Sequence, residues 1–124
     1  MRKRTPLYLL CLVLLLLVLY FLRIAGPVGA DSFDRTAGPL IFTRHAKCRM
    51  ICRQIDQSEV EDILKNGKIN MSKSEPNDKP DPKYALEGST KDGQQVRIIF
   101  AMSKRGVVVI TVIDLNKEWA CDCK

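Results

Sequence analysis

Three residues near the middle of the chain have the types and the spacing to bind an anion. His45, Arg49 and Arg53 follow one another at intervals of four. On a helix such positions form one row, because each residue turns the chain by about 100°. Two guanidinium groups can clamp a phosphate or carboxylate, and an imidazole can move a proton near neutral pH. The row therefore predicts an anion site.

The same row is suited to metal-free cleavage of RNA. A base must take the ribose 2′ proton while cations stabilise the charge that develops on the phosphate. Arg97 on one expected strand and Thr111 on the next would complete such a catalytic site across a cleft. The alternative is a solvated helix rim, since surface ion pairs contribute only ~0 to 1 kcal/mol each. What supports a chemical role is that His45 is the only histidine of the chain.

Four cysteines offer a second kind of chemistry. Cys48 and Cys52 flank the histidine–arginine row, and Cys121 and Cys123 lie in the C-terminal tail. The alternatives are disulfides between helix and tail, four thiolates around a zinc ion, or reduced cysteines in the core. The C-x-C spacing is tight for two ligands of one metal, so disulfides are favoured and no metal or other cofactor is expected. Four cysteines allow three connectivities, and the sequence does not distinguish them.

An apolar export segment precedes these residues. Residues 2–4 are all basic, residues 6–22 form an apolar run, and residues 28–30 are small. The run is longer than the core of a typical signal peptide and shorter than the ~20 residues that span a bilayer comfortably. Residues 1–30 are therefore either a cleaved signal peptide or an anchor that remains in the membrane through residues 6–24.

The charge pattern indicates where the rest of the chain is located. Because the basic cluster comes before the apolar run, either alternative leaves the remainder outside the cytoplasm. We expect a cell-envelope protein, periplasmic or secreted, with an inner-membrane anchor if the segment is uncleaved. From Asp31 onward the net charge is 16 − 14 = +2, against +6 for the whole chain. Such a domain lacks the broad positive field of non-specific nucleic-acid binders, so an anion site must be local.

Two helices must position the candidate residues. Residues 26–40 contain five glycines and prolines and no periodic apolar pattern, which predicts a tether; the linker is expected at residues 31–39 and the domain at residues 40–124. Residues 43–54 predict the first helix. The positions expected to form its buried stripe are Cys48, Ile51, Cys52 and Ile55. Asp56 and Glu59 predict a capping box at the start of the second helix, and Asn66-Gly67 predicts a left-handed stop. Its expected buried residues are Val60, Ile63 and Leu64.

The rest of the chain predicts a small sheet. Residues 70–83 contain three prolines among polar residues and predict an exposed loop. Residues 84–87, 95–102 and 107–115 predict strands, with a hairpin turn at residues 91–93. The expected fold class is α+β: two N-terminal helices packed on a three-stranded antiparallel sheet, preceded by the apolar export segment.

Residues 40 to 115 resemble a small bacterial family described as domain of unknown function 4258. The resemblance rests on the pattern Phe42-Thr-x-His45-x-x-x-Arg49-Met50-x-x-Arg53-x-Ile55, then Glu59-Val60, Gly67, Val96-Arg97-Ile-Ile-Phe100 and Val-Val-Val-Ile-Thr111-Val. It implies a helical hairpin on an antiparallel sheet, similar in layout to RelE-like and colicin-type ribonuclease toxins. It also implies that His45, Arg49, Arg53, Arg97 and Thr111 are the motif positions.

Three functions are consistent with these patterns. The domain binds an anionic group, it cleaves RNA without a metal, or it is a disulfide-stabilised module that contacts another protein. An exported domain meets no cytoplasmic RNA unless it is delivered to another cell. Export therefore favours binding over RNA cleavage.

Overall fold

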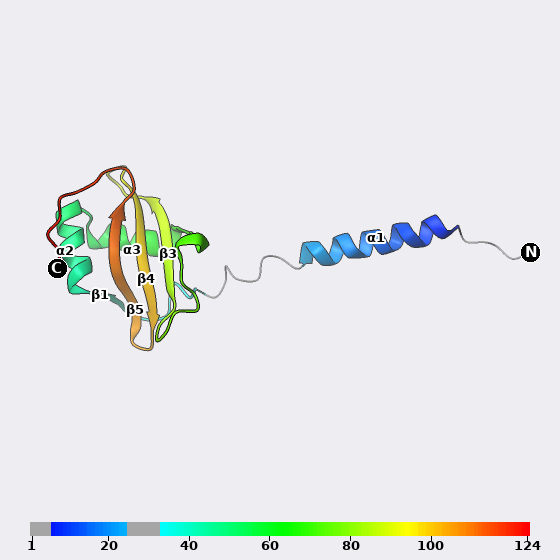
Figure 1. Cartoon of the computed structure of the whole chain (residues 1–124), viewed down its shortest axis with the longest axis horizontal. Coiled ribbons are helices and arrows are strands. Elements are labelled where there is room, and N and C mark those ends of the chain that lie inside the picture. The colour runs from blue at the N-terminus through cyan, green and yellow to red at the C-terminus, as the bar shows by residue number, and fades with distance from the viewer. Residues whose placement is uncertain (1–5, 25–32) are drawn as a thin grey trace, which may run out of the picture. The chain divides into compact units, whose positions relative to one another are not determined.

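The computed structural model describes residues 6–24 and 33–124, which belong to two units (Figure 1). The first unit contains α1 (Leu7–Ile24), whose side chains are all exposed. This helix is long and apolar enough to cross a membrane, and a signal sequence would meet the same test. The basic residues 2–4, the cleavage site expected at Ala30 and the first two residues of the expected linker lie outside the described residues.

The second unit is built on a five-stranded sheet in the order β1-β5-β4-β3-β2. Its strands are β1 (Leu40–Phe42), β2 (Lys68–Ile69), β3 (Lys83–Ser89), β4 (Gln95–Ser103) and β5 (Gly106–Asp114). The last three form the antiparallel meander that the sequence predicted. The prediction of only three strands was wrong, because β1 adds in parallel to β5 and β2 adds antiparallel to β3. Strands of three and two residues are too short to show an alternating pattern.

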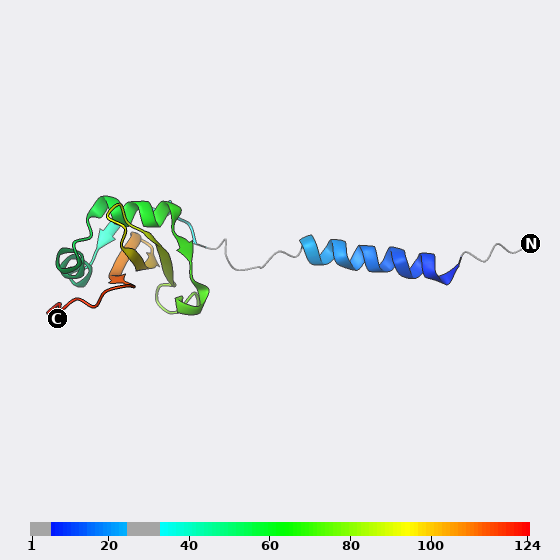
Figure 2. The same ribbon diagram turned by 90° about the horizontal axis from the view of Figure 1, so that it is seen from above.

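Two helices of ten residues each accompany the sheet, α2 (Arg44–Arg53) and α3 (Gln57–Asn66), together with a short 3₁₀ turn, η1 (Met71–Lys73). Figure 2 shows α3 lying across one face of the sheet, and both views place α2 beside β5. The α+β class and the helical pair before the meander are thus confirmed.

The helix α2 is defined by clear signals at both ends. At its start, the side chain of Thr43 accepts a hydrogen bond from the main-chain N–H of Ala46 at 3.0 Å, which is an N-cap. At its end, Gln54 has a left-handed backbone with φ of 57°. Its N–H donates to the carbonyl oxygens of Met50 and Ile51, which closes the last turn.

The buried side of α2 differs from the prediction. Ala46 and Met50 face the core, whereas Ile51 is 80% exposed. The half-buried residues Cys48 and Cys52 face the C-terminal tail, to which they are bonded. Ile55, the fourth residue of the predicted stripe, is buried as expected, just beyond the end of the helix. A disulfide cysteine and a core residue look alike in a hydrophobic pattern, so the pattern assigned the other three positions to the wrong side of the helix.

The helix α3 follows its sequence signals more closely. Asp56 and Glu59 form the predicted capping box, in which each side chain accepts from the other residue's N–H. The predicted core residues are all buried: Val60, Ile63 and Leu64. The left-handed stop was wrong, since Gly67 has φ of −64°. This glycine is required for another reason: a Cβ atom there would lie 2.4 Å from the carbonyl oxygen of Ile63.

The packed domain begins earlier than the sequence predicted. Phe33, in the expected linker, is only 6% exposed and lies in the core, with its ring 4.9 Å from that of Tyr84 and 6.2 Å from that of Phe100. The guanidinium of Arg35 donates to carbonyl oxygens at the end of α3, at 2.7 and 2.9 Å. One phenylalanine and one arginine among glycines and prolines have no periodicity, so the pattern did not mark them as part of the domain.

Candidate functional site

The helix α2 lies along an unpaired part of β5. The strand β1 pairs with β5 only at residues 107–109, so later main-chain groups on that edge need other partners. The hydroxyl of Thr43 donates to the carbonyl oxygens of Val109 and Ile110 at 3.1 and 3.2 Å. Further along, Arg53 donates from Nη1 to the carbonyl oxygen of Val112. These contacts fix both ends of α2 against the strand.

On α2, three side chains form what we call the basic row: His45, Arg49 and Arg53. The Nε of Arg49 donates to Nε2 of His45 at 3.4 Å, and both residues are half-buried. At that distance the hydrogen bond is weak, and it requires His45 to have no proton on Nε2. Within the part of the chain that the structure describes, the two Nη groups of Arg49 have no protein partner. They are available to a ligand.

Arg53 ends the basic row and is partly committed to the fold. One of its Nη groups bonds to β5, and its buried Nε has no hydrogen-bond partner among the described residues. Burial, followed by the positive charge of Arg49, lowers the pKa of Arg53, while Asp114 acts in the opposite direction. The charges of Arg49 and Arg53 therefore act on each other, and an anion placed between them would relieve that repulsion.

The basic row is part of a helix without acidic residues. The sequence of α2 contains Arg44, Lys47, Arg49 and Arg53 in addition to the histidine. Over residues 6–24 and 33–124, no carboxylate oxygen lies within 4.0 Å of a nitrogen of these side chains. A cation without an internal carboxylate retains its attraction for an external anion.

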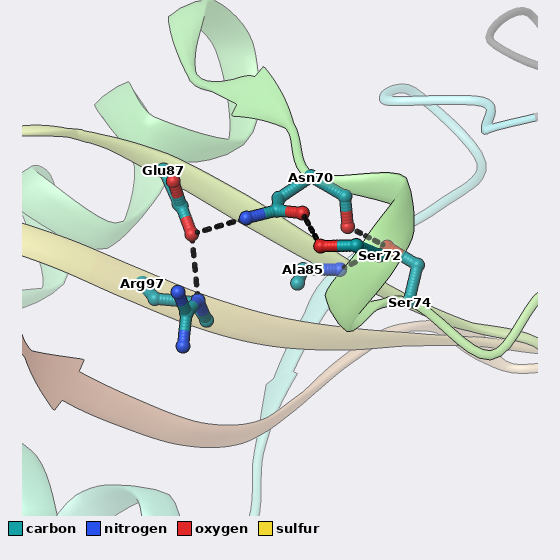
Figure 3. Close-up of polar contacts among 6 residues, drawn as sticks. All are labelled: Asn70, Ser72, Ser74, Ala85, Glu87 and Arg97. Carbon is teal, nitrogen blue, oxygen red and sulfur yellow. Dashed lines mark hydrogen bonds and ion pairs between the residues drawn. The ribbon is translucent and has the colours of Figure 1, made fainter.

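Arg97, by contrast, belongs to what we call the Glu87 cluster: Asn70, Glu87 and Arg97 (Figure 3). It lies opposite Glu87 in the register of β3 and β4, and its Nε donates to Oε1 of Glu87 at 2.6 Å. The side-chain amide of Asn70 donates to the same oxygen at 2.9 Å. These two hydrogen bonds, that of Asn70 first, hold the pKa of Glu87 below its ordinary value. Arg97 is thus neutralised inside the domain.

Thr111 lies on β5 opposite Ile99 and is half-buried. The carbonyl groups on either side of it, those of Ile110 and Val112, accept hydrogen bonds from Thr43 and Arg53. The structure therefore brings His45, Arg49 and Arg53 together and places Thr111 on the strand next to them. Arg97 is occupied by Glu87, and no contact joins it to the basic row in the described residues.

Comparison with known proteins adds one finding. The profile of the family described as "Domain of unknown function (DUF4258)" matches residues 42–114. The chain belongs to the DUF4258 family. Searches among curated proteins and among solved structures find no match. The matched segment of this DUF4258 domain contains all five predicted motif positions: His45, Arg49, Arg53, Arg97 and Thr111.

The four domain cysteines of this DUF4258 protein form two disulfides. They join Cys48 to Cys123 and Cys52 to Cys121, with Cα–Cα distances of 5.8 and 5.9 Å. The two bonds fasten one side of α2 to the C-terminal tail, and they leave no thiolate among these four residues for zinc. The tail cysteines lie beyond residue 114, outside the family match. The covalent connection is therefore an addition to the matched DUF4258 segment.

The sequence did not predict the groove next to Arg53. The groove has a volume of about 540 Å³ and is lined by Arg53, Ile113 and residues 114–119. Within it, the indole Nε1 of Trp119 donates to Asp114 at 2.9 Å, and the ammonium of Lys117 lies 3.7 Å from the centre of the indole ring. The hydrogen bond from Trp119 is the first cause of a lowered pKa at Asp114. The tail has no periodic pattern from which this arrangement could be predicted.

The Glu87 cluster was also missed, although a signal for it exists. The predicted turn at residues 91–93 fixes the hairpin register, and that register places Glu87 opposite Arg97. Opposite charges at directly paired positions on one face of a sheet attract each other. Pairing the residues on either side of this turn therefore predicts an ion pair between Glu87 and Arg97.

Proposed function

We propose that this DUF4258 domain acts outside the cytoplasm and binds an anionic group, a phosphate or a carboxylate, at the basic row. The observation that carries the proposal is the state of Arg49. Its guanidinium lies next to His45 and has no carboxylate within 4.0 Å among the described residues. A half-buried guanidinium with free Nη groups can bind two oxygens of one anion side by side.

The neighbours of Arg49 support the same chemistry. The imidazole of His45, which accepts from Arg49 at Nε2, carries a proton on Nδ1 that it can donate to the anion, and Arg53 would add positive charge. The row is half-buried, so water screens these interactions less than at an open surface. The three side chains of the basic row can therefore bind an anion together, and this binding does not require a chemical reaction.

Two features support a location outside the cytoplasm. The helix α1 has the length and composition of a signal sequence or a membrane span. The disulfides of α2 and the tail belong to an oxidising compartment, because cytosolic reductants keep most thiols reduced. Both features agree with the order of basic and apolar residues at the N-terminus.

RNA cleavage by the basic row is the weaker alternative. In that reaction Arg97 was expected to stabilise the developing charge from across a cleft. Glu87 already neutralises Arg97 through a hydrogen bond of 2.6 Å. An arginine bound to a carboxylate must lose that partner before it can stabilise a phosphate, which opposes catalysis. Binding is therefore the function that the geometry favours.

Titration of the full chain in detergent with inorganic phosphate, followed by NMR, tests the binding proposal. Arg49→Ala should weaken binding about tenfold, the equivalent of ~1.4 kcal/mol for one lost charged hydrogen bond. Arg105→Ala is the matched control, because Arg105 is exposed on the turn between β4 and β5 and carries the same charge. Equal affinities for both variants, or no phosphate binding by the wild type, would contradict the proposal.

A separate experiment addresses RNA cleavage. Wild type and His45→Ala are incubated with labelled RNA at high protein concentration without metal ions. We expect no cleavage by either protein. Cleavage by the wild type that is lost in His45→Ala would establish the enzyme instead. Absence of both phosphate binding and cleavage would leave the protein-interaction module as the remaining hypothesis.

A further inference from the structure

A second surface of α2 is unlike the basic row. We call it the outer face, and it consists of Arg44, Lys47 and Ile51. Positions separated by three and four residues lie on one side of a helix, so these three side chains are neighbours. All three are exposed, and Ile51 is the most exposed large apolar residue of the described part of the domain, at 80%. At about 100° per residue, the outer face lies nearly opposite the basic row.

A groove adjoins the outer face. Its volume is about 440 Å³, and it is lined by Lys47, Met50, Ile51, Gln54, Ile55 and Asp56. Of these residues only Asp56 is acidic, and Oδ1 of its carboxylate accepts from the N–H of Glu59 and the hydroxyl of Ser58 at the start of α3. The surface therefore combines an exposed apolar side chain, an adjoining groove and two cations without carboxylate partners among the described residues.

The charges of this surface indicate which partner it fits. Arg44 and Lys47 lie near Ile51 along one side of α2, and the helix has no acidic residue. Anionic lipid headgroups attract lysine and arginine at a membrane surface, while an apolar side chain beside them enters the boundary with the acyl chains. A neutral protein surface would match Ile51 but leave both cations without a partner.

The length of the chain before the domain makes a membrane the nearest such surface. The helix α1 ends at Ile24, and the core begins at Phe33. Residues 25–32 lie between them, and eight residues reach no further than roughly 30 Å when fully extended. While α1 is in a bilayer, the domain stays within this reach of the bilayer surface, so even weak contacts are favoured by a high effective concentration.

We propose that the outer face of α2 docks on anionic lipid headgroups of the membrane that α1 enters. Arg44 and Lys47 bind lipid phosphates, and Ile51 enters the layer between headgroups and acyl chains. The inference does not depend on the anion site of the basic row, because the two surfaces use different residues. Arg49→Ala, which weakens phosphate binding at the row, should leave docking unchanged.

The test uses the full chain in phosphatidylcholine vesicles, with and without phosphatidylglycerol. Ile51→Trp reports insertion through quenching of its fluorescence by phosphatidylcholine that carries bromine on its acyl chains. Asn77→Trp is the control, since Asn77 is exposed in the loop before β3, at the edge of the sheet away from α2. Wild type, with Trp119 as its single tryptophan, supplies the background signal.

The charges are tested in the Ile51→Trp background. Arg44→Glu/Lys47→Glu reverses the two cations of the outer face. Lys73→Glu/Lys79→Glu produces the same change in net charge at exposed residues near β3. A circular dichroism spectrum and a urea unfolding midpoint equal to those of the parent protein show that each variant is folded.

With phosphatidylglycerol present, we expect loss of fluorescence for Ile51→Trp and none above background for Asn77→Trp. The loss should disappear in the Arg44→Glu/Lys47→Glu variant and persist in the Lys73→Glu/Lys79→Glu variant. Docking on lipid is overturned if Ile51→Trp and Asn77→Trp are quenched alike. It is also overturned if both pairs of charge reversals have the same effect. Protection of Ile51→Trp from a water-soluble quencher without quenching by bromolipid would instead indicate a protein partner or a second copy.

Discussion

The basic row and the Glu87 cluster both contain a half-buried arginine, yet the two arginines differ in their neighbours. In the cluster, Arg97 lies 2.6 Å from a carboxylate oxygen, and Asn70 holds that carboxylate from the other side. In the row, Arg49 contacts only an imidazole at 3.4 Å and has no carboxylate within 4.0 Å among the described residues. Each arginine uses only its Nε for these contacts, but the charge of Arg97 is balanced by a carboxylate, whereas the charge of Arg49 is not.

The loop beside β3 shows why the Glu87 cluster serves the fold. The N–H of Asn70 donates to the carbonyl oxygen of Ala85 at 2.8 Å, and the hydroxyl of Ser74 accepts from the N–H of Ala85 at 2.9 Å. The same loop thus covers the outer edge of β3 and fixes the carboxylate that binds Arg97 (Figure 3). Edge strands need such partners. An arginine in this setting stabilises the sheet.

The largest expected effect comes from the covalent bonds that only the α2 region has. Replacing Cys48, Cys52, Cys121 and Cys123 by alanine removes links that close loops of 75 and 69 residues in sequence separation. The free energy of unfolding should fall by roughly 4–5 kcal/mol, because the unfolded chain regains the entropy of open loops. Urea denaturation of the full chain in detergent measures the loss.

Cys11→Ser is the control for this variant, since Cys11 is exposed on α1 and forms no disulfide. It should leave the unfolding free energy unchanged. If the four-alanine variant also loses less than about 1 kcal/mol, well under the range for a native disulfide, the disulfides do not hold α2. The two regions would then not differ in how they are fixed.

The next effect separates the two arginines by what they bind. Arg49→Ala should weaken phosphate binding about tenfold, whereas Arg97→Ala should leave it unchanged because the carboxylate of Glu87 balances the charge of Arg97. Titration of both variants with phosphate, under the same conditions, measures the difference. Equal losses of affinity in the two variants would mean that Arg97 also contacts the ligand. That result would support the single site of Arg97 and the basic row that the sequence predicted.

The two variants should also differ in stability, by a smaller amount. Here Arg97→Ala should have the larger effect, whereas Arg49→Ala has the larger effect on phosphate binding. Arg97→Ala removes a partly buried ion pair and leaves Glu87 with Asn70 alone, which should lower the unfolding free energy by about 1 kcal/mol. Arg49→Ala removes only a weak hydrogen bond and should change it by less than about 0.5 kcal/mol. The same urea denaturation compares the two. A larger loss for Arg49→Ala would show that the basic row is built for the fold.

Some parts of this fold could be predicted from the sequence and others could not. Local signals predicted the elements well: the capping box of α3, the turn at residues 91–93 and the three long strands all correspond to the structure. The parts that were not predicted depend on partners that are distant in the sequence. The strand β1 forms only because β5 provides an edge, and Phe33 is buried only because two other aromatic rings surround it. The local pattern of apolar residues around β1 and Phe33 gives no information about these partners.

The candidate site, too, could be predicted only in part. Helical spacing placed His45, Arg49 and Arg53 together, and the structure joins them. The grouping of Arg97 with them assumed a cleft, whereas the hairpin register pairs it with Glu87. The cysteines could be assigned to disulfides but not to specific pairs, because pairing depends on where the tail returns to α2.

The smallest expected effect concerns pH and again involves the Glu87 cluster. Hydrogen bonds from Asn70 and Arg97 lower the pKa of Glu87 from its ordinary 4.5, so the folded state favours the carboxylate more than the unfolded state does. The stabilisation is complete above the unfolded pKa. It is lost as the pH falls through the lower, folded pKa, because the unfolded chain binds the proton first. Glu87→Gln should therefore reduce the pH dependence of stability below ~pH 4.5.

Unfolding free energies of wild type and Glu87→Gln, measured in urea at several values from neutral to acidic pH, test this. The two curves should be separated at neutral pH and should approach each other on acidification, since a protonated glutamate and the glutamine that replaces it are both uncharged. Asp114 also has a lowered pKa but is present in both proteins, so its contribution cancels in the difference. Parallel curves would mean that the carboxylate of Glu87 has no preferential partner in the folded state. Arg97 would then be as available to an anion as Arg49 is.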